Sequence, residues 1–345
     1  MKTEHFEPVR LAAQGIRRPA SLLCATFCVL LMGGLASAKT TYVSFDVKGS
    51  PDTEPRQINA PGEVTGYWLD ASNAAHGFVR SADGTIAKFD PPGSTTTYSW
   101  GISDKGVVDG DWYDTNGMSH GFVRSADGKI TSFDPAGSTD TEPLYINVKG
   151  EIAGSFADGS GIYHGFTRKA DGTIGTFDVA GAVDTFGGGI NKSGTVSGYY
   201  DDNQGLIHAF FRASDGNVTT FDVPGAVSTF ASHINDAGVV AGSFYDDQQV
   251  VHGFVRAVDG TIVTFDPPGS VETRVAGVNN KNVISGFFID SAGSVHGFIR
   301  SAAGKSTAYD YPKATDTTGG GLNASGAVTG SYLNKSGGHG FIRTK

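Results

Sequence analysis

The chain has 345 residues, with 26 basic and 35 acidic side chains and a formal net charge of −9 at pH 7. This acidic balance disfavours nucleic acid and anionic membranes as partners, because both repel a negatively charged protein. The only two cysteines, Cys24 and Cys28, lie near the N-terminus, which excludes disulfides, thiolate metal sites and a cysteine nucleophile from the rest of the chain.

Residues 1–38 have the composition of a cleaved export signal. A basic region precedes the apolar run Ala20–Leu35, which is short for a membrane span, and Ala36-Ser37-Ala38 forms an A-x-A cleavage site. We predict general secretion to a secreted or periplasmic location, with an uncleaved anchor as the alternative. Cleavage leaves 307 residues, with 22 basic and 33 acidic side chains and a net charge of −11. We therefore expect no membrane insertion after cleavage.

From Thr41 onward the chain repeats with a period of 44 residues, which shortens to 43 at the last step. One series is a His-Gly-Phe tag, once His-Ala-Phe, that begins at His76, His120, His164, His208, His252, His296 and His339. A second series is an aspartate preceded by Phe or Tyr, at Asp46, Asp90, Asp134, Asp178, Asp222, Asp266 and Asp310. Several series that share one period indicate a repeat architecture.

One copy of the repeat contains four short runs that are typical of β-strands. In the second copy these are Tyr98–Ser103, Val107–Tyr113, His120–Arg124 and Lys129–Asp134, with alternating apolar and polar residues. Asn-x-x-Gly and Ala-Asp-Gly segments between the runs favour tight hairpin turns. Four antiparallel strands in about 40–45 residues predict the blade of a β-propeller.

The two ends of the repeat region complement each other. Thr41–Val47 is a Phe-Asp strand without its His-Gly-Phe partner, and His339–Arg343 is the reverse. We predict an all-β, seven-bladed β-propeller closed by pairing of the terminal strands, with residues 39–345 as one domain and the product as a monomer. An open β-solenoid is the alternative that the complementary ends disfavour.

Residues that recur in every copy are expected to serve the fold. We predict hydrogen bonds from the histidines to the recurring aspartates or threonines, rather than metal coordination, since seven equivalent sites around a ring diverge. The arginine four residues after each histidine, such as Arg80, is expected to pair with a turn carboxylate such as Asp83. Mid-strand glycines such as Gly66 and Gly110 are expected where adjacent sheets approach closely.

Positions at which the copies differ are the candidates for ligand contacts. Along the inner strands these are Arg56, Trp100, Tyr145, His233 and Arg274, which we expect to line or rim the central channel on the face that carries the histidines. As a binding site, the aromatic residues would stack on a ligand and the others would make polar contacts. As an enzyme, His233 would be a catalytic acid or base beside Glu54, Glu142 or Glu272. Surface variation without function is the third reading.

No cofactor is predicted. Acidic loops raise structural calcium as a weak option, at Asp201-Asp202, Asp246-Asp247 and Asp290, but their spacing matches no EF-hand. The chain has no nucleophile elbow, phosphate-binding loop, His-Glu-x-x-His motif or dinucleotide fingerprint.

The tag and its surroundings, over Thr41–Arg343, resemble the HAF repeat, a family of probable extracellular repeats in exported bacterial proteins. His208-Ala209-Phe210 is the one copy with the eponymous spelling. The resemblance implies export and a propeller-like fold, and it implies no reaction. We therefore expect a non-enzymatic propeller that binds an extracellular glycan, peptide, protein or small ligand. The alternatives are a propeller lyase or hydrolase acting on a polysaccharide or cyclic peptide, and a structural or adhesive component of the cell envelope.

Overall fold

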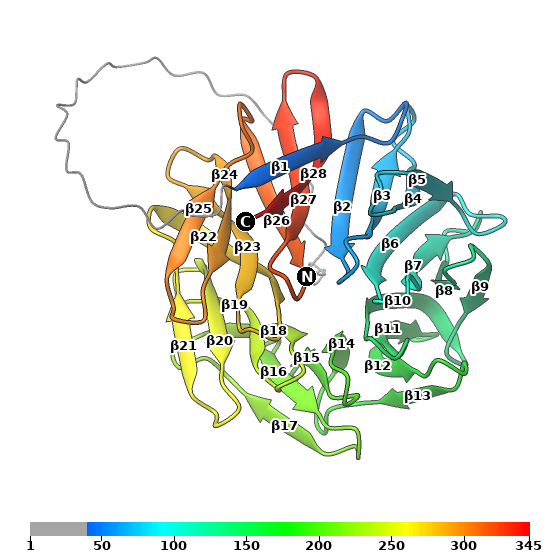
Figure 1. Cartoon of the computed structure of the whole chain (residues 1–345). Helices are drawn as coiled ribbons and strands as arrows, with labels where there is room; N and C mark the ends of the chain where they lie inside the picture. The colour runs from blue at the N-terminus through cyan, green and yellow to red at the C-terminus, as the bar shows by residue number, and fades with distance from the viewer. Residues whose placement is uncertain (1–39) are drawn as a thin grey trace, which may run out of the picture. The chain divides into compact units, whose positions relative to one another are not determined.

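The computed structural model describes residues 40–345, so the predicted export signal, Met1–Ala38, and its cleavage site lie outside the described residues. All regular structure in the described part is β: it consists of 28 strands (Figure 1). Between residues 40 and 345, no helix is long and apolar enough to cross a bilayer.

The strands follow the repeat in units of four, each antiparallel to its neighbour in the chain. The first three units are β2 (Asp52–Ile58), β3 (Val64–Leu69), β4 (Ala75–Arg80), β5 (Ile86–Phe89); β6 (Thr96–Ile102), β7 (Val108–Tyr113), β8 (Ser119–Arg124), β9 (Ile130–Phe133); and β10 (Ser138–Ile146), β11 (Ile152–Asp158), β12 (Tyr163–Arg168), β13 (Ile174–Phe177). The next three are β14 (Asp184–Ile190), β15 (Val196–Asp201), β16 (Ile207–Arg212), β17 (Val218–Phe221); β18 (Ser228–Ile234), β19 (Val240–Tyr245), β20 (Val251–Arg256), β21 (Ile262–Phe265); and β22 (Ser270–Val278), β23 (Ile284–Asp290), β24 (Val295–Arg300), β25 (Ser306–Tyr309). The predicted runs of the second copy coincide with β6–β9 to within two residues at each end.

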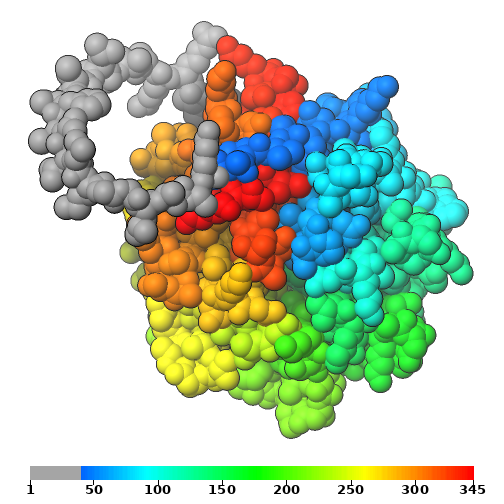
Figure 2. Space-filling view, in the orientation of Figure 1, coloured from blue at the N-terminus to red at the C-terminus, as the bar shows by residue number. Residues whose placement is uncertain are grey.

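The last unit takes its strands from both ends of the described chain. It contains β26 (Asp316–Leu322), β27 (Val328–Asn334) and β28 (Gly337–Thr344), and β1 (Thr41–Phe45) pairs antiparallel with β28. Phe45 lies opposite Gly340 in the same register in which Phe89 lies opposite Gly77 in the first unit. Figure 2 shows β1, in blue, lying along the red C-terminal strand. The lone Phe-Asp run therefore occupies the fourth-strand position beside β28.

The first strand of each unit, here called the inner strand, lies nearest a common centre (Figure 1). Each inner strand contacts the inner strand of the next unit, and β26 contacts β2. The space between these strands is called the channel below. Each inner strand runs from the end of its sheet that carries the histidines, here the His face, to the opposite end. That opposite end carries the Asn-x-x-Gly turns and is called the Asn face.

Apolar packing lies between adjacent units. The phenylalanine of each tag is fully buried, at Phe78, Phe122, Phe166, Phe210, Phe254, Phe298 and Phe341. Phe78 belongs to a cluster with Phe45 and Val47 from the preceding unit, and Phe122 packs with Phe89 in the same way. Because each sheet is covered mainly by its neighbours, a long chain can be stabilised without one large core.

The mid-strand glycines are crowded by their own sheet as well as by the adjacent one. The expected approach of the adjacent sheet is present, since a Cβ on Gly187 would lie 2.5 Å from the carbonyl oxygen of Gly154 in the preceding unit, and Ser99 donates to the carbonyl oxygen of Gly66. A Cβ atom on Gly66 would overlap the carbonyl oxygen of Glu54, on the strand beside it. The cause is a bulge in the inner strand between Pro55 and Gln57, which turns that carbonyl toward β3. All six other inner strands carry a register shift at the equivalent position, at Ser99/Gly101, Pro143/Tyr145, Gly187/Ile190, Phe230/His233, Val275/Gly277 and Gly319/Leu322.

Candidate functional site in the channel

The recurring histidines form one network on the His face. In every unit the His Nδ1 atom lies 2.7–2.9 Å from a carboxylate oxygen of the aspartate that follows the fourth strand. Two threonines extend the network to the next unit, because Thr141 donates to Asp134 and Thr273 donates to Asp266. The histidine hydrogen bonds predicted from the repeat are therefore present, mainly to the aspartates.

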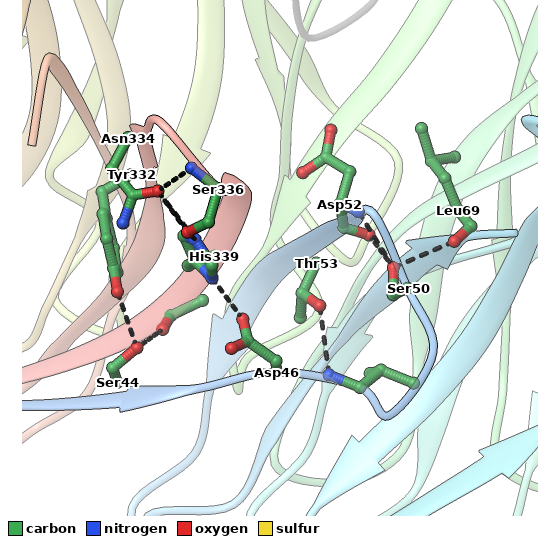
Figure 3. Close-up of polar contacts among 12 residues, drawn as sticks. Ser44, Asp46, Ser50, Asp52, Thr53, Leu69, Tyr332, Asn334, Ser336 and His339 are labelled. Atoms are coloured by element: carbon green, nitrogen blue, oxygen red, sulfur yellow. Dashed lines mark hydrogen bonds and ion pairs between the residues drawn. The ribbon is translucent and has the colours of Figure 1, made fainter. Parts of the chain in front are cut away.

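The histidine of the last unit pairs with an aspartate from the other end of the chain. His339 Nδ1 lies 2.8 Å from Asp46 Oδ1, and its Nε2 lies 3.1 Å from Asn334 Oδ1 (Figure 3). Ser44 Oγ lies 2.9 Å from the hydroxyl of Tyr332 in the same region. Side chains as well as strands thus join the two ends.

Each histidine also faces a second polar group and an aromatic ring. In six units the histidine Nε2 atom lies 3.3–3.9 Å from a carboxylate oxygen of a turn aspartate. In all seven units the imidazole packs on an aromatic ring, and the two ring centroids are 4.6–5.2 Å apart. Burial opposes charge on His164, but its hydrogen bonds and charge interactions with Asp178 and Asp158 raise its pKa above the usual value. The pKa values of His208, His252 and His296 are raised for the same reasons.

The acidic loops considered for calcium supply these turn aspartates. Asp202 Oδ1 accepts hydrogen bonds from two backbone N–H groups of its turn, and its Oδ2 lies 3.4 Å from His208 Nε2. Asp246 and Asp290 have the same arrangement. Among residues 40–345, no group of three or more His, Cys, Asp or Glu side chains has the geometry to hold a metal ion.

The recurring arginines do not form the expected ion pairs. Within the described residues, no contact of 4 Å or less joins Arg80 to Asp83. Instead Arg80 donates to the backbone carbonyl of Ser81 and lies over the ring of Phe45 in the preceding unit. The same cation–π contact recurs in every unit, with 4.7–5.0 Å between guanidinium and ring centre. The arginines therefore contact the backbone of their own turns and also connect adjacent sheets.

A chain of asparagines on the Asn face was not anticipated from the sequence. The Nδ2 atom of each donates to the backbone carbonyl of the equivalent residue in the next unit, over 2.9–3.2 Å, at Asn59, Asn147, Asn191, Asn235, Asn279 and Asn323. Asn323 donates to Asn59, which joins the last unit to the first. The second unit carries Ser103 at this position. The 44-residue spacing of these asparagines is present in the sequence, but the Asn-x-x-Gly segments by themselves predict only tight turns and not contacts between units.

Arg56 and Trp100 lie together in the half of the channel nearer the His face. The Arg56 guanidinium donates to the hydroxyl of Tyr67 over 2.6 Å and lies 5.3 Å from the centre of the Trp100 ring. The Trp100 indole donates to Asp111 Oδ1 over 2.5 Å and stacks on Tyr98. This group, here called the Arg56–Trp100 cluster, joins the first and second units.

Two carboxyl groups of this region have strongly raised pKa values. Burial raises the pKa of Glu54 to about 7; the nearby charge of Asp52 adds to the rise and that of Arg56 opposes it. Burial raises the pKa of Asp111 to about 8, although its hydrogen bond from Trp100 acts in the other direction. Carboxyl groups that change protonation near neutral pH are more frequent at functional sites than elsewhere.

Arg274 lies on β22 at the position equivalent to Glu54, two residues nearer the His face than the position of Arg56. Its Nε atom donates to Glu272 Oε1 over 2.6 Å, so the guanidinium has a carboxylate partner on its own strand. Arg56, Trp100 and Arg274 thus occupy the half of the channel that was expected to meet a ligand.

Tyr145 and His233 lie together deeper in the channel, toward the Asn face. The Tyr145 hydroxyl is 3.4 Å from His233 Nε2, and the rings meet edge to face at 5.1 Å. Both side chains line a cavity of about 110 Å³ that inner strands from six of the seven units bound. The five predicted site residues are therefore divided between two levels of the channel.

His233 is not beside the carboxylates proposed as its catalytic partners. Glu54 and Glu142 occupy positions three residues nearer the His face, and because one of the three is the bulge residue this corresponds to about 7 Å along a strand. Burial lowers the pKa of His233 to about 4, so the imidazole is neutral at physiological pH. The side chain that contacts His233 is Tyr145. A catalytic role for His233 stays a prediction, and the carboxylate expected as its acid–base partner is not beside it.

No family model matches the chain, and no curated protein matches it. Solved structures are similar in fold. Virginiamycin B lyase from Staphylococcus aureus has a TM-score of 0.61 at 14% identity, over 89% of this chain and 100% of that one. The β-propeller domain of the Trilobed protease from Pyrococcus furiosus has a TM-score of 0.56 at 9% identity, over 84% and 94%. The BP39L lectin from Burkholderia pseudomallei has a TM-score of 0.53 at 11% identity, over 85% and 98%. The chain therefore has a β-propeller fold, and these identities indicate nothing finer.

Proposed function

We propose that the chain is an exported, monomeric, seven-bladed propeller, closed by β1 and β28, that binds a glycan at the His-face end of its channel. The observation that carries the proposal is the Arg56–Trp100 cluster, whose residues occupy positions that differ from one copy of the repeat to the next. Stacked Tyr98 and Trp100 rings suit the apolar face of a sugar, and the Arg56 guanidinium and the Asp111 carboxyl suit its hydroxyls. A lectin of the same fold supports this use of the scaffold.

Glycan and peptide arrays probed with the mature protein test the proposal. Trp100→Ala should lose binding at least tenfold, because a stacking surface and a hydrogen-bond donor both disappear. Trp112→Ala is the matched control: Trp112 packs on His120 in the repeated network and should be dispensable for binding. Equal glycan binding by Trp100→Ala and wild type would remove the cluster from recognition. Binding confined to peptides would replace the glycan with a peptide.

A propeller lyase or hydrolase is the second candidate, and the raised pKa values of Glu54 and Asp111 favour it. A carboxyl group that is protonated near neutral pH can donate a proton to a leaving group. The lyase of the same fold shows that the scaffold accommodates catalysis. Turnover of polysaccharides or cyclic peptides that Asp111→Asn abolishes and His233→Ala leaves intact would assign the acid to Asp111. The reverse pattern would assign the reaction to His233.

A structural or adhesive role in the cell envelope is the remaining proposal. It predicts fractionation with the envelope and no saturable binding of any soluble glycan or peptide. Mass spectrometry of the exported product tests export itself, with Lys39 expected as the new N-terminus.

A further inference from the structure

The level of the channel that Tyr145 and His233 occupy has an alternating composition. At this position the seven inner strands carry Gln57, Gly101, Tyr145, Gly189, His233, Gly277 and Gly321. Each large polar side chain thus has a glycine on both neighbouring strands. The glycines are required by space, since a Cβ on Gly321 would lie 2.9 Å from the backbone carbonyl oxygen of Arg56 and one on Gly189 would lie 3.0 Å from the Cα of His233.

The cavity at this level has two kinds of wall. Gln57, Tyr145 and His233 contribute an amide, a phenol and an imidazole from three different inner strands, β2, β10 and β18. The other wall is an aliphatic collar contributed by the ends of the inner strands, at Ile146, Ile190, Ile234, Val278 and Leu322. Within the described residues, no Asp, Glu, Lys or Arg lines the cavity. Because His233 is neutral above about pH 4, the wall carries hydrogen-bonding groups without a fixed charge.

The polar groups of this region are not fully satisfied by one another. The Tyr145–His233 contact, at 3.4 Å, is at the long end of the range for a hydrogen bond. Beside Tyr145 lies Asp109, which is fully buried and receives no hydrogen bond from any side chain among residues 40–345; only backbone N–H groups face its carboxyl group. Buried polar groups are normally paired, so an incompletely paired set around a cavity indicates a missing partner.

We propose that this cavity is a second binding site, distinct from the His-face cluster, for a small uncharged molecule that combines one ring with one hydroxyl or amide group. A volume of about 110 Å³ is well below the roughly 300 Å³ of the smallest sites for drug-sized ligands. It is comparable to an engineered cavity of about 150 Å³ that accepts benzene. The ring packs against the aliphatic collar, and the polar group bonds with Tyr145, His233 or Gln57. An anionic ligand is excluded because no Lys or Arg side chain lines the cavity and the Asp109 carboxyl lies beside it.

Phenol and benzoate, which share a ring and differ in charge, are the probes. Ligand-observed NMR on the mature protein should show saturable, one-to-one binding of phenol, and benzoate should bind at least tenfold more weakly. Tyr145→Phe keeps the ring and removes the hydroxyl, so phenol binding should fall about fivefold. Ala276→Phe places a ring in the cavity and should abolish binding; Ala276→Leu provides a smaller filling residue if the first variant does not fold.

Trp100→Ala is the control that separates this site from the proposed glycan site. It should leave phenol binding unchanged, whereas Tyr145→Phe should leave glycan binding unchanged. The proposal is overturned if a folded Ala276 variant binds phenol as wild type does, if benzoate binds as tightly as phenol, or if wild type shows no saturation. A crystal structure from a phenol soak with only water in the cavity would also overturn it.

Discussion

The His face and the channel interior belong to the same sheets, yet the residues of the His face are the same in every unit, whereas those of the channel interior differ from unit to unit. On the His face a histidine, an aspartate and an aromatic ring meet in every unit with nearly the same distances. A few residues further along the inner strands, equivalent positions carry Arg56, Trp100, Gly188 and Ser232. The constant contacts position each sheet against the next, so the inner strands can change side chains without changing the scaffold. Stability and recognition should therefore respond to different substitutions.

Removing β1 should have the largest effect. Deletion of Thr41–Val47 exposes the length of β28, removes Asp46 from His339 and takes Phe45 and Val47 out of a core cluster. We expect the loss to approach the whole stability of a typical domain, about 5–15 kcal/mol, so that cooperative unfolding disappears. Thermal unfolding by circular dichroism is the measurement. A deletion variant that melts like the intact protein would show that the ring is not closed by this strand.

A core substitution in one unit should be the next most damaging. Phe254→Ala removes a fully buried ring between adjacent sheets and should cost about 3–5 kcal/mol. Val263→Ala, on the exposed side of the same unit, should change stability by less than about 0.5 kcal/mol. Urea denaturation of both variants measures the difference. Similar losses from both would mean that packing between the sheets does not determine stability.

Stability should be greater at pH 5 than at pH 8. Burial raises the pKa of Asp109 to about 7, so the folded state binds its proton more tightly, and stability falls as pH rises from about 4 through 7. Asp111 acts in the same direction up to about pH 8. The histidines with raised pKa values also contribute less as pH increases above 6.5. Asp158 and Asp202, with lowered pKa values, instead lose their contribution below about pH 4.

The substitution Asp109→Asn distinguishes the contribution of the channel to this pH dependence of stability from the contribution of the His face. It should remove about 2–4 kcal/mol of the difference between pH 5 and pH 8, since one pKa unit corresponds to about 1.4 kcal/mol. Asp178→Asn, which changes one histidine partner on the exposed His face, should have a much smaller effect. Unfolding free energies at the two pH values test this, and an unchanged difference in Asp109→Asn would contradict the assignment.

Loss of one asparagine of the Asn face should have the smallest effect on stability. Asn235→Ala removes the Nδ2 donor to the carbonyl of Asn279 and leaves buried backbone groups without a partner, which should cost about 1–3 kcal/mol. Asn217→Ala, in an exposed turn where the side chain bonds only Asp215, is the control. Ser103→Asn adds an amide where the second unit has none and should be neutral or slightly stabilising. Equal stability of Asn235→Ala and Asn217→Ala would show that the asparagine chain does not join the units.

The sequence predicted the repeating four-strand scaffold because the same local pattern recurs in every copy of the repeat. The four-strand unit, the pairing of Thr41–Val47 with the C-terminal tag and the histidine–aspartate bonds follow from a period and from turn chemistry. The predicted ion pair of Arg80 was wrong because proximity in sequence favoured the carboxylate of the nearest turn, and the bulge that crowds Gly66 was not predicted. A cation–π contact to the preceding unit and a strand bulge are set by how sheets pack, and neither has a signature within one copy.

What the sequence determined by itself is the repeating scaffold and the positions at which it varies, since both are properties of a period. Only the tertiary structure decided how those positions group. Arg56 and Trp100 are 44 residues apart and meet, as Tyr145 and His233 do at 88 residues, while His233 and Glu142 do not. The physical reason is that two quantities set the distance between two channel residues. One is the difference in their positions along the inner strands, and the other is the number of strands between them. A shift of three residues across the bulge moves a side chain about 7 Å along the channel, which is enough to separate two side chains that share no contact.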